Sequence, residues 1–186
     1  MEKTKHIKRG HAFMMAGEMG QLWRVSQGAF RLERPSLEGH TLVQLALPGD
    51  LLGVESLCAE PYAFTVTALT TSVVAEQTVN HELSRFTAVA QGYLQQQRRM
   101  HDMMKMRSGP VADRLAHFLK LLARDADGNH AELDRRDLPI LKEIAAIVDS
   151  STETVCRELN AFLPARVYQR PVRGAWVGGD EMAMAA

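Results

Sequence analysis

A stretch near the C-terminal end of the chain carries hydrogen-bonding side chains at close spacing. Within residues 151–157, Ser151, Thr152 and Thr154 carry hydroxyls, Glu153 a carboxylate and Arg157 a guanidinium group. An arginine can make two parallel hydrogen bonds to guanine, a glutamate can accept one from cytosine, and hydroxyls can bond to bases or phosphates. These residue types are therefore the ones expected of a surface that reads the major groove of double-stranded DNA.

The residues that follow add positive charge. Residues 166–177 have the pattern of a β-hairpin, and residues 151–177 hold four arginines against two glutamates, a local charge of +2. The whole chain has no net charge, because its 22 basic and 22 acidic residues cancel. We expect Arg166 and Arg170 of this hairpin to contact DNA phosphates. An ordinary helical hairpin with solvated charges is the alternative.

Two short helices must position the candidate reading residues. Apolar residues recur at helical spacing through residues 138–148. The stripe of the second helix consists of Val155, Leu159 and Phe162. Polar residues 149–151 predict a turn between them, and Ser150 with Glu153 has the spacing of a capping box. Two helices joined by so short a turn are typical of a helix-turn-helix.

The first part of the chain predicts β-structure. Between about Gly10 and Gln77, short alternating runs rich in β-forming residues are separated by glycines. Short strands at close spacing with glycine turns favour a small β-barrel or sandwich. An irregular, loop-rich α+β module is the alternative.

Residues 81–106 predict one long amphipathic helix. This segment has no proline and one glycine, Gly92, and Gly109-Pro110 ends the pattern. Its stripe consists of Phe86, Val89, Ala90, Tyr93, Leu94, Gln97, Met100 and Met104. A helix of this length with methionines near the stripe favours packing against a partner helix, so we expect a homodimer.

The composition excludes several classes of protein. The chain has 186 residues, 46% of them hydrophobic and 24% charged, which is ordinary for a folded protein. Its two cysteines, Cys58 and Cys156, are too few for a disulfide framework or a four-thiolate metal site. The charged N-terminus lacks a secretory signal, and no apolar run approaches the length of a membrane span. We therefore expect a cytoplasmic protein with no membrane partner.

Six short motifs give the chain a specific resemblance. They are IKRGH at 7–11, LWRVSQG at 22–28, LPGDLLG at 47–53, VTALT at 66–70, VADRLA at 111–116 and STETVCR at 151–157. In these motifs the chain resembles the Crp–Fnr family of bacterial transcription regulators over nearly its whole length. The resemblance implies a two-domain α+β protein with four segments. They are a double-stranded β-helix, or jelly-roll, sensor domain (1–80), a dimerisation helix (81–107), a winged helix-turn-helix (108–178) and a tail (179–186).

The resemblance also implies partners. It predicts that a homodimer binds a palindromic operator in double-stranded DNA, with RNA polymerase as a further partner if the protein is an activator. The expected DNA-binding residues are Ser151, Thr152, Glu153, Thr154, Arg157, Arg166 and Arg170. No enzymatic activity, catalytic residue or metal site is expected.

The expected effector site departs from that of cyclic-nucleotide-binding relatives. In those relatives a glutamate follows the glycine at Gly53, and an arginine–hydroxyl pair holds the cyclic phosphate. This chain has Val54, with Glu55 one place later, and Tyr62-Ala63. A buried phosphate without arginine loses its charge-assisted partner, which argues against cyclic AMP. The expected pocket residues are Gly53, Glu55, Ser56, Tyr62 and Arg99, for another effector or for none.

No cofactor is expected either. Two cysteines cannot hold the iron–sulfur cluster of the oxygen-sensing branch. Val54-Glu55 stand where the haem-binding branch has its histidine, and the seven histidines show no metal-ligand spacing. The main alternative function is a cupin-like metal-dependent β-barrel enzyme, which would need clustered histidine and glutamate ligands and leaves residues 138–177 unexplained.

Overall fold

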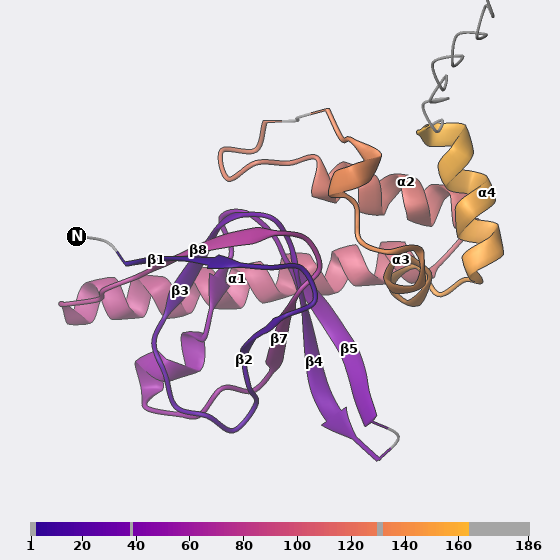
Figure 1. Ribbon diagram of the computed structural model, residues 1–186. Coiled ribbons are helices and arrows are strands. Elements are labelled where there is room, and N and C mark those ends of the chain that lie inside the picture. Colours follow the sequence, from indigo (N-terminus) through magenta and orange to yellow (C-terminus); the bar gives the residue numbers. More distant parts are fainter. Residues whose placement is uncertain (1–2, 38, 130–131, 164–186) are drawn as a thin grey trace, which may run out of the picture.

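The computed structural model describes residues 3–37, 39–129 and 132–163, in which a β-domain precedes a set of helices (Figure 1). The strands are β1 (Thr4–Ile7), β2 (Ala12–Met14), β3 (Trp23–Gln27), β4 (Phe30–Ser36), β5 (Gly39–Ala46), β6 (Leu51–Leu52), β7 (Thr65–Ala68) and β8 (Ser72–Glu76). The α-helices are α1 (Glu82–Arg107), α2 (Val111–Leu122), α3 (Leu141–Ile147) and α4 (Thr152–Phe162). Two 3-10 helices are η1 (Val54–Cys58) and η2 (Arg135–Asp137). The predicted α+β class is confirmed.

The strands form two four-stranded antiparallel sheets. Their orders are β1-β8-β3-β6 and β2-β7-β4-β5, so strands that are distant in sequence pair within each sheet. The core between the sheets contains Met14, Trp23, Val25, Phe30, Leu32, Ala46, Leu52, Tyr62, Val66, Ala68 and Val74. This jelly-roll-like arrangement agrees with the predicted β-domain, because alternating strands bury one face of each sheet.

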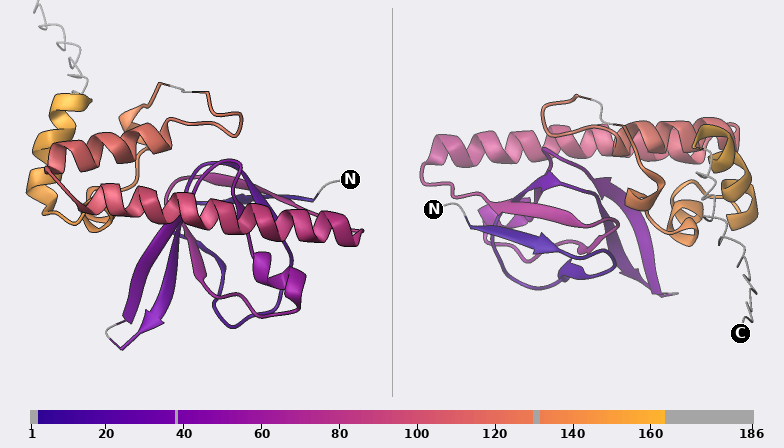
Figure 2. Two further views of the ribbon diagram at one scale, coloured as in Figure 1. Left: turned by 180° about the vertical axis from the view of Figure 1, so that it is seen from behind. Right: turned by 45° about the horizontal axis from the view of Figure 1, so that its top comes forward.

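Helix α1 lies along the β-domain over much of its length (Figure 2). Ala88 of α1 packs with Leu22 and Leu51 in a small buried cluster. The predicted long helix is therefore present, and its buried residues, Ala88, Gln95, Met103 and Met106, lie outside the predicted stripe. None of the helices in the described residues is long and apolar enough to cross a membrane.

The largest buried cluster joins the β-domain to the C-terminal helices. From the β-domain it takes Ala29, Leu45, Leu47 and Leu69, and from the helical part Met103, Met106, Leu115, Phe118, Leu119, Leu121, Leu138, Ile144, Ala145, Ile147, Val148, Val155 and Leu159. Two polar contacts cross the same boundary: Arg31 pairs with Glu143 at 3.5 Å, and Arg9 donates to the carbonyl of Leu138 at 3.3 Å. Helices α2–α4 are therefore docked on the β-domain through a shared core.

The turn between β3 and β4 requires a glycine. Gly28 has a φ of 83°, and a Cβ there would lie 2.7 Å from the Cα of Ser72 and 2.7 Å from the carbonyl oxygen of Thr71. Gly10 has a similar φ of 80°, but a Cβ there would meet nothing within 4 Å. The two positions share the same backbone conformation and differ in the space for a side chain.

We predict that Gly28→Ala destabilises the protein more than Gly10→Ala does. Each alanine is forced into the left-handed region, at about 1–2 kcal/mol, and Gly28→Ala adds a clash with backbone worth about 1–3 kcal/mol more. Urea unfolding of both variants measures the difference. Equal destabilisation of the two variants would show that the close approach at Ser72 is wrong.

Candidate functional site

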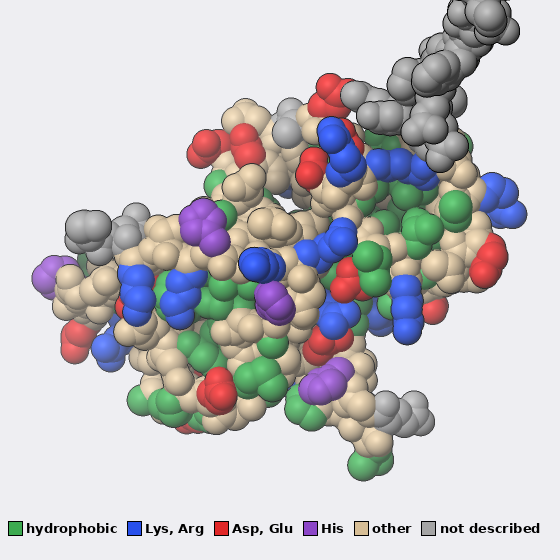
Figure 3. Space-filling model, viewed as in Figure 1, with side chains coloured by type: hydrophobic (Ala, Val, Ile, Leu, Met, Phe, Trp, Pro, Cys, Tyr) green, Lys and Arg blue, Asp and Glu red, His purple; other side chains and the backbone are tan. Residues whose placement is uncertain are grey.

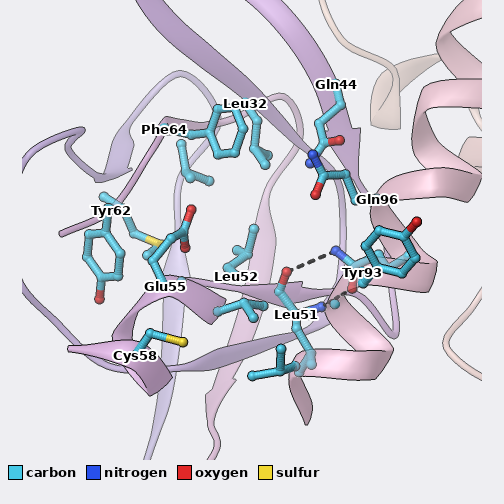
Figure 4. Close-up of a pocket in the computed structure, with 17 residues that line it drawn as sticks. Leu32, Gln44, Leu51, Leu52, Glu55, Cys58, Tyr62, Phe64, Tyr93 and Gln96 are labelled. Carbon is cyan, nitrogen blue, oxygen red and sulfur yellow. Dashed lines mark hydrogen bonds between the residues drawn. The ribbon is translucent and has the colours of Figure 1, made fainter. Parts of the chain in front are cut away.

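A cavity of about 270 Å³ lies between the β-domain and α1 (Figure 4). Its apolar walls come from Met14, Leu32, Leu51, Leu52, Val54, Phe64, Val66 and Val89. Its other lining residues are Gln44, Gly53, Glu55, Cys58, Tyr62, Gly92, Tyr93, Gln95 and Gln96. The cavity is thus mostly apolar, with a few polar groups from β5, η1 and α1.

Three of the five expected pocket residues line this cavity, and two do not. Gly53, Glu55 and Tyr62 belong to its wall. The Ser56 hydroxyl instead donates to the carbonyl of Gly53 at 2.6 Å, where it supports the first turn of η1. Arg99 lies elsewhere, in the ion pairs described below.

The cavity wall at η1 is held by short polar contacts. The backbone N–H of Ala63 donates to the carboxylate of Glu55 at 3.2 Å, and the hydroxyl of Tyr62 donates to the carbonyl of Gln21 at 2.9 Å. Burial raises the pKa of Tyr62 above its ordinary value, so the phenol stays protonated at neutral pH. These contacts fix where the Glu55 and Tyr62 side chains lie.

Two glycines allow the walls to approach one another. A Cβ on Gly53, whose φ is 75°, would lie 2.6 Å from the ring of Tyr62 and 2.8 Å from the carbonyl oxygen of Gln21. A Cβ on Gly92 would lie 2.9 Å from a methyl group of Val54. Gly92, the single glycine of α1, therefore lets this helix pack closely on η1.

Sequence reasoning missed the glutamines of the cavity. Gln44 is only 7% exposed, yet its side chain makes no hydrogen bond to another of the described residues. Figure 4 shows it reaching from β5 toward Gln96 of α1. Gln95 is 8% exposed and bridges the backbone of Leu51, accepting from its N–H at 2.7 Å and donating to its carbonyl at 3.0 Å.

The charge in the cavity lining is negative. Among the described residues, Glu55 is the only charged residue of the lining, and no lysine, arginine or histidine belongs to it. Arg34 lies 4.8 Å from the ring centroid of Phe64 but does not line the cavity. Within the part of the chain that the structure describes, no group of three or more His, Cys, Asp or Glu side chains could hold a metal ion.

Arg99 instead joins α1 to the loop before β6. Its guanidinium donates two hydrogen bonds to the carboxylate of Asp50, at 2.7 and 3.0 Å, and one to Asp102 at 2.8 Å. Asp102 also contacts His117 of α2 at 3.1 Å. Burial lowers the pKa of Arg99, but Asp50 and Asp102 more than offset this effect, so that the pKa lies above its ordinary value. The Arg99 guanidinium is therefore already paired with two carboxylates and has a structural role.

Helices α3 and α4 meet at the turn that the sequence predicted. The turn contains Asp149, which has a φ of 50°, a conformation that aspartate tolerates. Arg114 of α2 donates to the carbonyls of Val148 and Asp149 at 3.1 and 3.0 Å, and to that of Gly109 at 2.7 Å. One arginine thus fixes the turn relative to the start of α2.

The start of α4 differs by one residue from the predicted capping box. Ser151, and not Ser150, is the N-cap: its hydroxyl accepts from the N–H of Thr154 at 3.2 Å. The pKa of Glu153 is lowered, chiefly by a hydrogen bond with its own backbone N–H and then by the Ser151 hydroxyl. A carboxylate ionised at neutral pH suits the first turn of a helix.

The outward face of α4 carries the candidate reading residues. Val155 and Leu159 are buried as predicted, whereas Phe162 is 43% exposed, because it lies at the end of the helix. Thr152, Glu153 and Arg157 are exposed, Thr154 is half-buried, and Arg157 pairs with Glu158 at 3.3 Å. The expected hairpin with Arg166 and Arg170, and the tail, lie outside the described residues.

Comparisons with known proteins agree with this architecture. Residues 4–91 match the family of the cyclic nucleotide-binding domain. Among solved structures, the chain is similar to TTHB099, a CRP-family transcriptional regulator from Thermus thermophilus, with 26% identity and a TM-score of 0.63 over 85% of this chain and 83% of the other. No curated protein matches the chain.

Two further structures support the fold. FixK2 from Bradyrhizobium japonicum is 18% identical with a TM-score of 0.63, over 87% of this chain and 84% of its own. TTHA1359, a CRP/FNR-family regulator also from Thermus thermophilus, is 22% identical with a TM-score of 0.57, over 86% and 85%. At these identities the likeness is one of fold.

We predict that Arg99→Ala lowers the free energy of unfolding by about 3 kcal/mol, because it leaves the carboxylates of Asp50 and Asp102 without their cation in a largely buried site. Arg98→Ala is the control, since Arg98 is exposed and one residue away. Urea unfolding of the two variants measures the difference. A cost for Arg99→Ala no larger than that for Arg98→Ala would contradict the assignment.

Proposed function

We propose that the chain is a Crp/Fnr-like transcription regulator that binds a palindromic operator in double-stranded DNA as a homodimer, in line with its cyclic nucleotide-binding domain and its similarity to a CRP-family regulator. The observation that carries the proposal is the outward face of α4. Its N-terminus is capped by Ser151, its inner residues are buried, and its first turns present exposed polar side chains. This is the geometry in which a recognition helix can enter the major groove.

Glu153 and Arg157 are the proposed base-reading pair. They are four residues apart on α4, so they lie on the same face of the helix, and both are exposed. Arginine is the best two-pronged partner of guanine, and glutamate accepts from the amino group of cytosine. We propose that the pair reads a G·C-containing step, with Ser151, Thr152 and Thr154 contacting phosphates or neighbouring bases.

Phosphate binding needs charge that the described C-terminal helices lack. Across the described residues from 108 to 163, seven Lys and Arg face ten Asp and Glu, and Figure 3 shows the two signs intermixed over these helices. We therefore propose that Arg166 and Arg170 supply much of the phosphate contact. The salt dependence of binding is accordingly expected to be shallow, because few phosphates are neutralised.

The outer face of α1 supports a homodimer. Spacings of three and four residues join Leu83, Phe86, Ala90, Tyr93, Gln97, Met100 and Met104, all of them exposed. This is the heptad pattern of a coiled-coil seam, and apolar side chains such as Phe86 (72% exposed) and Met104 (65% exposed) lack a cover in the described residues. We propose that a second copy of α1 covers this seam.

We further propose that cyclic AMP is not the effector, and that the protein responds to another molecule or to none. The support is the cavity lining, which among the described residues contains no cationic side chain to pair with a cyclic phosphate. Arg99, the one arginine expected there, is occupied by Asp50 and Asp102. A phosphate buried beside Glu55 would instead meet a like charge.

We predict that Phe86→Glu combined with Met104→Glu converts the dimer to monomers, because two glutamates on each helix place like charges along an apolar seam. Sedimentation velocity measures the mass. Ser84→Glu combined with Gln91→Glu is the matched control, because both residues are exposed on α1 away from the seam. A seam variant that stays dimeric would exclude this helix as the interface.

We predict that Arg157→Ala weakens operator binding by about 1–3 kcal/mol and relaxes the choice at one guanine of each half-site. Selection of sites from random duplex DNA should yield inverted repeats with centres about 34–36 Å apart. Lys142→Ala removes the same charge from the exposed surface of α3 and should leave base preference unchanged. Selected sites without dyad symmetry, or an unchanged preference in Arg157→Ala, would contradict the proposal.

We predict a different result for Arg166→Ala and Arg170→Ala. As proposed phosphate contacts, they should weaken binding to all sequences alike and reduce the salt slope by about one unit each. Titrations of a labelled duplex at several salt concentrations measure both quantities. A change of base preference in either variant would assign that arginine to base reading.

A further inference from the structure

We propose that the cavity beneath α1 binds a small organic cation, namely an amine with an apolar body. That this ligand acts as an effector rests on the proposed regulatory function. That the cavity binds it does not, because the binding chemistry follows from the cavity itself. The ligand class is opposite in charge to a cyclic nucleotide.

The first argument is charge. Glu55 is the only charged residue of the described lining, and one of its oxygens accepts the N–H of Ala63 while the other has no hydrogen bond to a described residue. In Figure 4 its carboxylate points into the space beside Tyr62. An ammonium group there gains a charge-assisted hydrogen bond, whereas an anion meets a like charge in a partly desolvated site.

The second argument is the unpaired amide of Gln44. Its side chain is more than nine-tenths buried and has no hydrogen-bonding partner among the described residues. The Gln44 amide atoms are not among the fully buried side-chain atoms that lack a partner, so they are accessible from the cavity, where a ligand or water can complete their hydrogen bonds. Figure 4 places Gln44 and Gln96 across the cavity from Glu55. A glutamine amide has an acceptor oxygen and an NH2 donor, so its oxygen can accept an N–H of the ligand, while the preference for positive charge comes from Glu55.

The third argument is the shape and composition of the walls. Tyr62 lies on one side and Tyr93 on the other, with leucine, valine and phenylalanine side chains between them (Figure 4). Aromatic faces attract cations, and apolar walls bury the hydrocarbon part of a ligand. A volume of about 270 Å³ corresponds to roughly nine water molecules at about 30 Å³ each. The ligand is therefore small, of the size of one ring with a short side chain.

A matched series of probes tests the charge preference. The probes are 2-phenylethylamine, 2-phenylethanol, 3-phenylpropanoate and cyclic AMP, titrated into the full chain by calorimetry. The amine should bind about tenfold more tightly than the neutral alcohol, as expected for one charge-assisted hydrogen bond. The carboxylate and cyclic AMP should bind more weakly than the alcohol.

Two variants and a control locate the site. Glu55→Gln should bring the amine to the affinity of the alcohol, and Glu60→Gln is the control, because Glu60 is an exposed carboxylate near η1 that does not line the cavity. Gln44→Leu removes an amide that bonds to none of the described residues, so it should still fold, and it should weaken amine binding about fivefold, as expected for one lost hydrogen bond. Gln44→Leu can still test the inference if Glu55→Gln does not fold.

Several results would overturn the inference. They are binding of 3-phenylpropanoate or cyclic AMP as tight as that of the amine, no binding of the amine at millimolar concentration, or an amine affinity unchanged in both variants. DNA binding is measured separately on the same preparations. A protein that binds DNA but not the amine contradicts this inference alone, and one that binds the amine but no duplex contradicts the proposed function alone.

Discussion

The attachment of α1 to the β-domain is the constraint on which the rest of the structure depends. Gln95 hydrogen-bonds both backbone groups of Leu51, and one turn later Arg99 binds the carboxylate of Asp50 with two hydrogen bonds. Gly92 lets the same face approach η1. These contacts hold one side of the helix against the sheets, close the cavity beneath it, and leave the opposite side exposed. They also fix where the last turns of α1 meet α2.

Helix α1 therefore contributes to three surfaces: the contact with the β-domain, the lining of the cavity and the proposed dimer seam. Ala88, Gln95 and Asp102 recur every seven residues on the side toward the β-domain, and the exposed heptad seam lies on the other side. Tyr93 belongs to both, because it lines the cavity and is still 60% exposed on the proposed seam. A ligand in the cavity and a second copy of the chain would thus meet at one side chain. Such shared residues are a direct physical way for two binding events to influence one another.

The class of fold, the long helix and the two short helices near the C-terminal end of the chain could be predicted from the sequence, because glycine-bounded strands and apolar spacing are local signals. Sequence reasoning placed Arg99 in the pocket, since nothing local shows that Asp50, forty-nine residues away, occupies that guanidinium. Gln44 was missed for a different reason. The ladder between β4 and β5 shifts register after Leu32, so Leu32 pairs with Gln44 but Glu33 pairs with Leu42. Simple alternation would place Leu42 and Gln44 on the same face of β5, but the irregularity at Val43 breaks that alternation.

The core that the β-domain shares with the helices determines how much free energy it costs to move α4 relative to the β-domain. Leu45, Leu47 and Leu69 of the β-domain are buried against α1–α4, so moving these helices away would expose apolar surface at a cost in free energy. A ligand can shift such an equilibrium only by the difference between its affinities for the two arrangements. The contacts from the cavity to the helices are contiguous: Gln95 lines the cavity, Arg99 lies one turn further, and Asp102 joins Arg99 to His117 of α2. Because Arg114 of α2 also holds the turn before α4, a shift of α2 would move the outward face of α4 with it.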